Sequence, residues 1–319
     1  MNDLVHHWGQ HTVDGLAKGA IYALVALGYT LVYGVLKLIN FAHSQVFMVG
    51  TWAVLGSWTL LGATDRPSLP FMLLLIIVGL LAAGLASGGV ALLIERIVYR
   101  PLRRRNAPPL IFLITTVGVS TILVEVFGLV LAKIFGHGFG RLIVGMPDVL
   151  PNKVFLRFGG TEITVKHLVV VLAAVVMLVS LDAFINRTRL GRGVRAVAQN
   201  RDIAALMGVD QDRIIMLIFT LGGVMAGAAA LLFSLQIGIT AFDIGVVLGL
   251  KAFTAAVLGG IGNLRGALLG GLLLGVVENF AATMTSSNWE DVAAYVVLVV
   301  VLMFRPSGLL GESLGRTRV

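Results

Sequence analysis

The chain has 319 residues, of which 58% are hydrophobic and 13% charged, and its formal net charge is +8. Apolar runs of about 18 residues or more recur along it, each long enough to cross a hydrocarbon core about 30 Å thick. This composition excludes a sizeable soluble domain. The chain has no cysteine, which excludes disulfide bonds, a thiol nucleophile and a cysteine-ligated metal.

The apolar runs are continuous rather than alternating, so we predict helices and not the strands of a closed barrel. The expected fold is an all-α integral membrane protein of about eight or nine transmembrane helices, with broken or re-entrant segments and an inverted repeat. The span at 245–262 is short and carries Lys251, so a re-entrant segment is the alternative there. The predicted spans are 13–35, 41–61, 70–94, 110–134, 165–185, 214–236, 245–262, 266–285 and 292–305.

Arginine-rich segments at three places set the expected orientation. They follow the third span (residues 96–105), the fifth span (residues 187–213) and the last span (from Arg305). Lys and Arg gather in cytoplasmic loops, and an even number of spans separates these segments, so all three are expected in the cytoplasm. Counting backwards places the N-terminus outside, unless a re-entrant segment near residues 36–45 reverses it. The loop at 135–164, with the β-prone stretch "EITV", is then extracytoplasmic.

Two interruptions of the apolar pattern can be compared. The sequence reads "LKLINFAHSQ" at residues 36–45 and "QIGITAFDIG" at residues 236–245, and each separates two apolar runs. The predicted topology puts them on opposite membrane faces. This arrangement indicates an inverted repeat, a common architecture of transporters.

Polar residues at membrane depth are costly and often functional. They cluster at the first interruption, where a broken helix would expose N–H groups that suit a carboxylate. The alternative is that Asn40 or Ser44 caps the next helix and His43 lies at the lipid interface. Lys251 and Thr254 lie in the short second-half span, where the alternative for the lysine is pairing within the bundle or snorkelling. The candidate translocation-path residues are Asn40, Phe41, His43, Ser44, Gln45, Lys251 and Thr254.

The polar segment "GVRAVAQNRDIAALMGVDQDR", residues 193–213, lies between two apolar runs. Asn200 is a good N-cap, Asp202 suits the first turn of a helix, and Gly208 can end the helix in a left-handed conformation. A helix of about two turns is marginal in water and needs a partner surface for its apolar residues. That surface is either the chain's own bundle or another protein. The apolar residues concerned are Ile203, Leu206 and Met207.

Four stretches, in chain order, resemble the LivH-type permease subunit of ABC importers for branched-chain amino acids. The match covers nearly the whole chain. One departure is Ser44, where the family usually has Gly after the Ala-His pair, and it bears on substrate preference. The stretches are "LGYTLVYGVLKLINFAHSQVFMVG", "ERIVYRPLR", "AVAQNRDIAALMGVDQDRI" and "KAFTAAVLGGIGNLRGALLGGLLLG".

The resemblance implies the permease subunit of an ATP-driven importer. Residues 1–319 would form a single transmembrane permease domain that carries branched-chain or broader hydrophobic amino acids. Residues 186–213 would be a cytoplasmic coupling segment, of which residues 195–210 would lie in a groove of a cytoplasmic ATPase. The coupling residues would be Arg195, Asn200, Asp202, Leu206, Met207 and Gly208.

By the same resemblance, the chain would be a multi-pass protein of the bacterial inner (plasma) membrane. Its partners would be a second homologous permease subunit, two cytoplasmic ATPase subunits, a periplasmic substrate-binding protein and membrane lipid, with no nucleic acid. We expect no catalytic residue, metal site or bound cofactor in this chain, since it lacks a Gly-rich phosphate loop and the partner ATPases would use the ATP and Mg.

Three alternatives stay open at this point. The first is a permease for urea or amides, which belongs to the same transporter class. The second is an ion-coupled secondary carrier, which would need functional acids at depth, such as Glu125 or Asp243. The third is a membrane anchor or scaffold without transport, which would tolerate apolar substitutions at Asn40 and Ser44.

Overall fold

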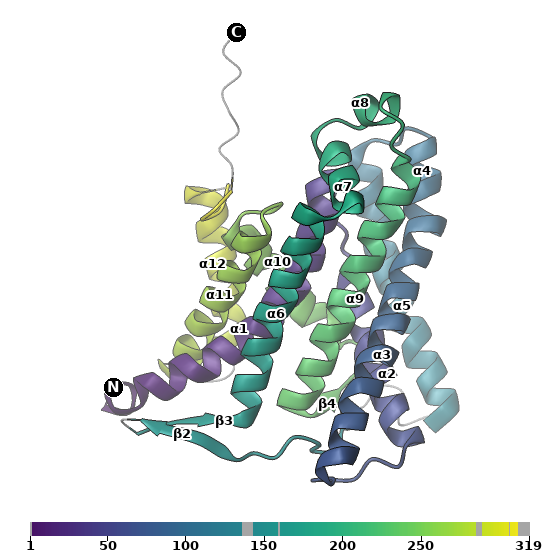
Figure 1. The fold of residues 1–319 in the computed structure, drawn as a ribbon. Helices are drawn as coiled ribbons and strands as arrows, with labels where there is room; N and C mark the ends of the chain where they lie inside the picture. Colours follow the sequence, from purple (N-terminus) through teal and green to yellow (C-terminus); the bar gives the residue numbers. More distant parts are fainter. Residues whose placement is uncertain (1, 136–142, 159, 285–288, 306, 312–319) are drawn as a thin grey trace.

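The computed structural model describes residues 2–135, 143–158, 160–284, 289–305 and 307–311, and each predicted span is a helix in it (Figure 1). The apolar helices are α1 (Asn2–Leu36), α2 (His43–Leu60), α3 (Leu69–Ile94), α5 (Pro109–Phe135), α6 (Val165–Arg187), α9 (Gln211–Ile237), α10 (Ile244–Gly259), α11 (Leu264–Met284) and α12 (Glu290–Phe304). The other elements are the π-helix η1 (Glu95–Tyr99), α4 (Arg100–Arg104), α7 (Arg189–Gln199), α8 (Arg201–Leu206), β1 (Val144–Gly145), β2 (Val154–Phe158), β3 (Thr161–Thr164) and β4 (Ile239–Thr240).

Six helices in the described part of the chain are long and apolar enough to cross a membrane: α1, α3 with its continuation to Arg104, α5, α6, α9 and α11. The remaining apolar helices α2, α10 and α12 are shorter, with 18, 16 and 15 residues. The prediction of an all-α integral membrane protein is confirmed.

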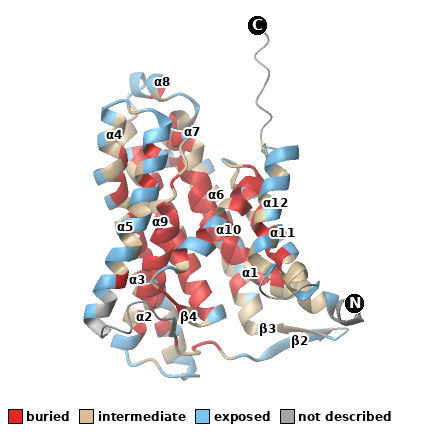
Figure 2. Ribbon diagram, turned by 180° about the vertical axis from the view of Figure 1, so that it is seen from behind, coloured by how far each residue is buried: buried red, intermediate tan, exposed pale blue. Residues whose placement is uncertain are grey.

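The helices form a buried centre and an apolar outer layer. In α1 and α9, 89% and 72% of the most apolar window is buried, against 22% in α3, 11% in α5 and 17% in α6. Figure 2 shows the buried residues concentrated along the central helices. Because leucine and isoleucine side chains on the outer helices face away from the bundle, that surface suits lipid.

The two ends of the molecule differ in charge and structure. Helices α4, α7 and α8 lie at one end, and the hairpin of β2 and β3 lies at the other, near the N-terminus (Figure 1). The arginines of these helices therefore share one end, as predicted, and we refer to it as the cytoplasmic end. The β-prone stretch "EITV" largely forms β3, while residues 136–142 and 159 of the same loop lie outside the described part, as do 312–319 at the C-terminus.

Helices α1 and α9 run in opposite directions, and each is followed by a residue with a left-handed backbone. Helix α1 ends before Lys37 (φ 56°) and α9 before Gly238 (φ 71°), both with left-handed backbones. Six residues outside any helix follow in each case, at 37–42 and 238–243, and we name them the first break and the second break. The strand β4 in the second break pairs with β1.

Helix packing confirms the predicted inverted repeat. Helix α1 packs on α11, as α9 packs on α3. Helix α2 packs on α3 and α9, and its counterpart α10 packs on α11 and α1. The unit α1–α3 thus corresponds to α9–α11 with reversed direction, as in many transporters.

Glycines allow the central helices to approach closely. Gly19 of α1 faces Gly271 of α11, and Gly227 of α9 faces Ala83 of α3, so that a Cβ on any of these glycines would collide with the facing helix. Such small-residue contacts are the usual means of close helix packing in membranes, where water does not drive association.

Candidate functional site

Helix α2 begins inside the bundle rather than at its surface. His43, its first residue, is 2% exposed, and its imidazole fills the space beside Gly28 of α1, where a Cβ would collide with the ring. Gly28 precedes the end of α1 by about two turns. The first break therefore carries the chain from the cytoplasmic end back into the bundle.

Helix α10 begins beside α2. Gly245 and Gly249 of α10 pack against Ser44, and a Cβ on either glycine would collide with it. The hydroxyl groups of Thr51 in α2 and Thr240 in the second break lie 2.7 Å apart and share a hydrogen bond. The N-terminal ends of the two broken helices therefore meet inside the bundle.

Two alternatives for the first break are wrong. The N-cap of α2 is Ala42, and no side chain caps the helix, so neither Asn40 nor Ser44 is the helix cap. Both instead bond within the turn: Asn40 Oδ1 accepts the N–H of Ala42 at 3.2 Å, and Ser44 Oγ donates to the carbonyl of Phe41 at 2.9 Å. His43 is buried, so it does not lie at the lipid interface.

Two polar atoms beside this meeting point have no hydrogen-bond partner in the described part of the chain. They are Nε2 of His43 and Oε1 of Gln45. The amide nitrogen of Gln45 donates to Ser120 Oγ of α5 at 3.1 Å. Since buried polar atoms are nearly always paired, these two atoms could contribute hydrogen bonds to a polar solute. Phe41 packs against Phe253 of α10, with ring centroids 5.7 Å apart.

Lys251 is buried and takes part in a network of ion pairs. It pairs with Glu278 of α11, with Asp291 of α12 at 2.6 Å, and with Glu290 at 3.7 Å. The pairing alternative for Lys251 is therefore confirmed. Thr254 is also buried, and its hydroxyl donates to the carbonyl of Leu250 in the preceding turn at 2.9 Å.

The same network reaches α1. Lys18 Nζ lies 2.9 Å from Glu290, and the hydroxyl of Tyr22 donates to Glu278 at 3.1 Å. Sequence reasoning missed Glu290 and Asp291, although an acidic pair in the first turn of the last apolar run could have suggested partners for the lysines.

A cavity of about 340 Å³ lies beside this network. Residues of α1, α9, α10, α12 and the second break line it, so it lies toward the end opposite α7 and α8 (Figure 1). Most of the lining side chains are apolar. The charged ones are Lys18, Asp243, Lys251 and Glu290.

The polar segment forms two helices, α7 and α8. Asn200 caps α8, because its side chain accepts the N–H of Ile203 at 3.0 Å, and Gly208 ends the turn with φ 81°. Both local predictions are confirmed. Helix α7 was not expected. It is fixed by Arg195, which donates to the carbonyl of Ile185 near the end of α6.

The apolar side chains of α8 point away from the chain's own bundle. Ile203 is 58% exposed, Leu206 87% and Met207 80%. Ala204, on the other side of the helix, is buried. Packing of the three apolar side chains against the chain's own bundle, the first of the two predicted alternatives, is therefore wrong.

Arg201 connects α8 to the centre of the bundle. Its guanidinium donates to the carbonyls of Val35 and Leu36, the last residues of α1, at 3.1 and 2.7 Å. Partial burial and the nearby charge of Arg103 lower the pKa of Arg201 from its ordinary value, but a guanidinium remains charged. Since the first break follows Leu36 directly, α8 is bonded to the residue before that break.

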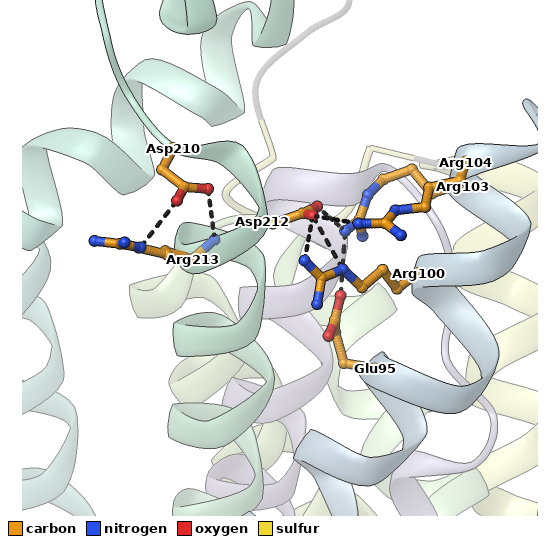
Figure 3. A network of polar contacts seen from close by, with 7 residues as sticks. All are labelled: Glu95, Arg100, Arg103, Arg104, Asp210, Asp212 and Arg213. Carbon is orange, nitrogen blue, oxygen red and sulfur yellow. Dashed lines mark hydrogen bonds and ion pairs between the residues drawn. The ribbon is translucent and has the colours of Figure 1, made fainter.

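A second connection joins α4 to the first turn of α9 (Figure 3). Asp212 accepts hydrogen bonds from Arg100 at 2.7 and 3.0 Å and from Arg103 at 2.5 Å, and Arg104 lies 3.7 Å away. Arg103 also bonds to the buried Glu95 of η1 at 3.2 Å. Both central helices are thus anchored at the cytoplasmic end.

An inverted pair of broken helices in a membrane bundle is the architecture of a transport protein. The chain matches the family described as the branched-chain amino acid transport system / permease component over residues 11–302. It belongs to this family of permeases, which are transport proteins and not enzymes. The permease subunit predicted from the sequence is thereby confirmed.

Two named relatives match nearly the whole chain. The chain is 39% identical to the high-affinity branched-chain amino acid transport system permease protein BraD of Pseudomonas aeruginosa, over 97% of each chain. It is 35% identical to the corresponding protein LivH of Salmonella typhimurium, over 98% of each. It is also similar to the solved structure of PsaBC from Streptococcus pneumoniae in complex with Fab, with 11% identity, a TM-score of 0.46 and coverage of 96% of this chain and 95% of that one.

Proposed function

We propose that the chain is the permease subunit of an ATP-driven importer in the bacterial inner (plasma) membrane. It forms the translocation path for branched-chain, or broader hydrophobic, amino acids. The observation that carries this proposal is identity of 35–39% along nearly the whole chain to permeases named for high-affinity branched-chain amino acid transport. The pair of broken helices at the centre supports it from the fold.

The coupling segment is the proposed contact with the ATPase. The exposed apolar side chains of α8 and of Met207, which follows it, would enter a groove of that subunit. Leu206 and Met207 are the most exposed of them. Asn200, Asp202 and Gly208 fix the length of the helix, and Arg195 holds α7 on α6. ATP and Mg act in the ATPase subunits and are not bound by this chain.

Movement of the coupling segment would reach both breaks. Arg201 bonds α8 to the last carbonyls of α1, and the cluster around Asp212 bonds α4 to the start of α9. Helices α1 and α9 are the buried central helices, and each leads into a break. Rocking of these two helices would open the meeting point of α2 and α10 alternately to the two sides.

The proposed path runs through that meeting point. The N-terminal ends of helices carry unpaired N–H groups and a partial positive charge, which suit the carboxylate of an amino acid. His43 and Gln45 would add hydrogen bonds there, and Phe41 would contact an apolar side chain. Asn40 and Ser44 maintain the turn.

The proposed assembly contains a second homologous permease subunit, two ATPase subunits, a periplasmic binding protein and the surrounding lipid. The test is to reconstitute these components in liposomes and to measure leucine uptake with and without ATP. We expect uptake only with ATP and the binding protein. If ATP hydrolysis drives uptake of urea but not of leucine, the proposed substrate is wrong and the chain is a urea permease. If leucine uptake is independent of ATP and follows an ion gradient, the chain is a secondary carrier and not an ATP-driven importer.

A further inference from the structure

The cavity beside Lys251 combines apolar walls with charges of both signs. Its volume of about 340 Å³ lies at the lower end of the range for small-molecule cavities. Ile21 of α1, Phe233 of α9 and Leu248 of α10 form apolar parts of its wall. A ligand that fits this lining is small, carries a positive charge and has an aliphatic part.

The charged groups in the lining are not equivalent. Lys18 and Lys251 already pair with carboxylates of α11 and α12. Asp243, at the N-cap position of α10, is exposed and makes no side-chain capping bond. No ion pair of its carboxylate occurs with any residue that the structure describes. Among the described residues of the lining, Asp243 is therefore the carboxylate without an ion-pair partner, and we take it as the group that faces a ligand's cation.

The cavity also lies next to the meeting point of the broken helices. Ile244 belongs to its lining, and the following residue, Gly245, packs against Ser44 at the start of α2. A ligand that leaves the cavity along α10 would thus arrive directly at the proposed path.

We propose that this cavity is an entry site for a zwitterionic α-amino acid with a branched aliphatic side chain. Asp243 receives the ammonium group, and the apolar wall accepts the side chain. The site rests on the proposed function, since it lies on the side from which an importer receives its cargo. The permease would then select its substrate at this site, in addition to any substrate selection by a binding protein.

The test is equilibrium binding of radiolabelled leucine to the purified complex of both permeases and the ATPases in nanodiscs, without the binding protein. We expect saturable binding that Asp243→Asn weakens by about tenfold or more, as for loss of a charged hydrogen-bond partner. In the original protein, 4-methylpentanoate, which lacks the ammonium group, should compete poorly. Asp65→Asn removes an exposed carboxylate from another loop and should leave binding unchanged.

A second variant, Val247→Trp, places a large ring in the lining and should remove leucine binding without changing Asp243. Melting temperature and co-purification with the ATPases verify that each variant is assembled. Unchanged binding in both variants, or no saturable binding of leucine to the original complex, would overturn the entry site, even if ATP-driven leucine uptake continues. Saturable binding without any ATP-driven uptake would support the site and count against the proposed function.

Discussion

At the scale of single residues, Gly28 and His43 fix where the first broken helix starts. The imidazole of His43 occupies the space that a side chain on Gly28 would need, and Gly222 of α9 lies against the same point. One missing Cβ thus allows α1, α2 and α9 to converge. The position of this polar ring is therefore set by close packing.

The substitution Gly28→Ala should destabilise the permease by about 1–3 kcal/mol, because an added methyl group in a tightly packed core forces its neighbours to move. Thermal unfolding of the purified complex measures this loss. Gly56→Ala, in α2, is the matched control, since a Cβ at that position would meet no atom within 4 Å beyond its chain neighbours and its own helix backbone. Addition of His43→Ala to Gly28→Ala should recover part of the loss, and additive losses would contradict the proposed packing.

At the scale of elements, α7 and α8 differ in how their helical structure is determined. Helix α8 has a cap, an acidic first turn and a terminal glycine, all of which are local signals. Helix α7 also has a local cap, since the Thr188 side chain accepts the N–H of Gly191, but it contains two glycines, which disfavour a helix. It is helical because Val194 and Val197 are buried and Gly191 fits closely against the end of α6.

The substitution Met207→Arg should prevent α8 from docking, because it places a charge in an apolar contact. Loss of an interface anchor costs about 2 kcal/mol or more, or roughly 30-fold in ATPase affinity. Co-purification of the ATPase and ATP-driven uptake measure the effect. Met303→Arg, at a similarly exposed methionine near the end of α12, should have little effect, and equal losses in the two variants would count against α8 as the docking element.

At the scale of the whole molecule, the inverted repeat brings together residues from opposite halves of the chain. Thr51 and Thr240 are 189 residues apart in sequence, and their hydroxyl groups share a hydrogen bond. This contact joins α2 to the second break. Transport by relative movement of the two halves requires this contact to change.

The pair Thr51→Cys and Thr240→Cys should form a disulfide on oxidation, since the bonded hydroxyls show that the two side chains are within reach. The chain has no other cysteine, so the cross-link is unambiguous. We expect the oxidised importer to lose uptake and reduction to restore it, with each single variant as the control. Full uptake by the cross-linked protein would show that the halves do not separate at this contact.

The sequence by itself determined the apolar helices, the common end of the arginine-bearing helices and the capped helix α8. Continuous apolar runs, arginine-rich loops and cap residues act over a few neighbouring positions, so their outcome is readable from the local pattern. The breaks were also recognisable, because polar residues such as Asn40 interrupt an apolar run. The family followed from motifs spread along the whole chain.

Only the tertiary structure decided which of these features meet. The partners of Lys251 come from α11 and α12, the start of α10 lies against Ser44, and the apolar side chains of α8 point away from the bundle. Each outcome depends on how helices distant in sequence pack against one another. Local patterns do not contain this information, because the same lysine can pair, snorkel or line a path, depending on the neighbours that the fold supplies.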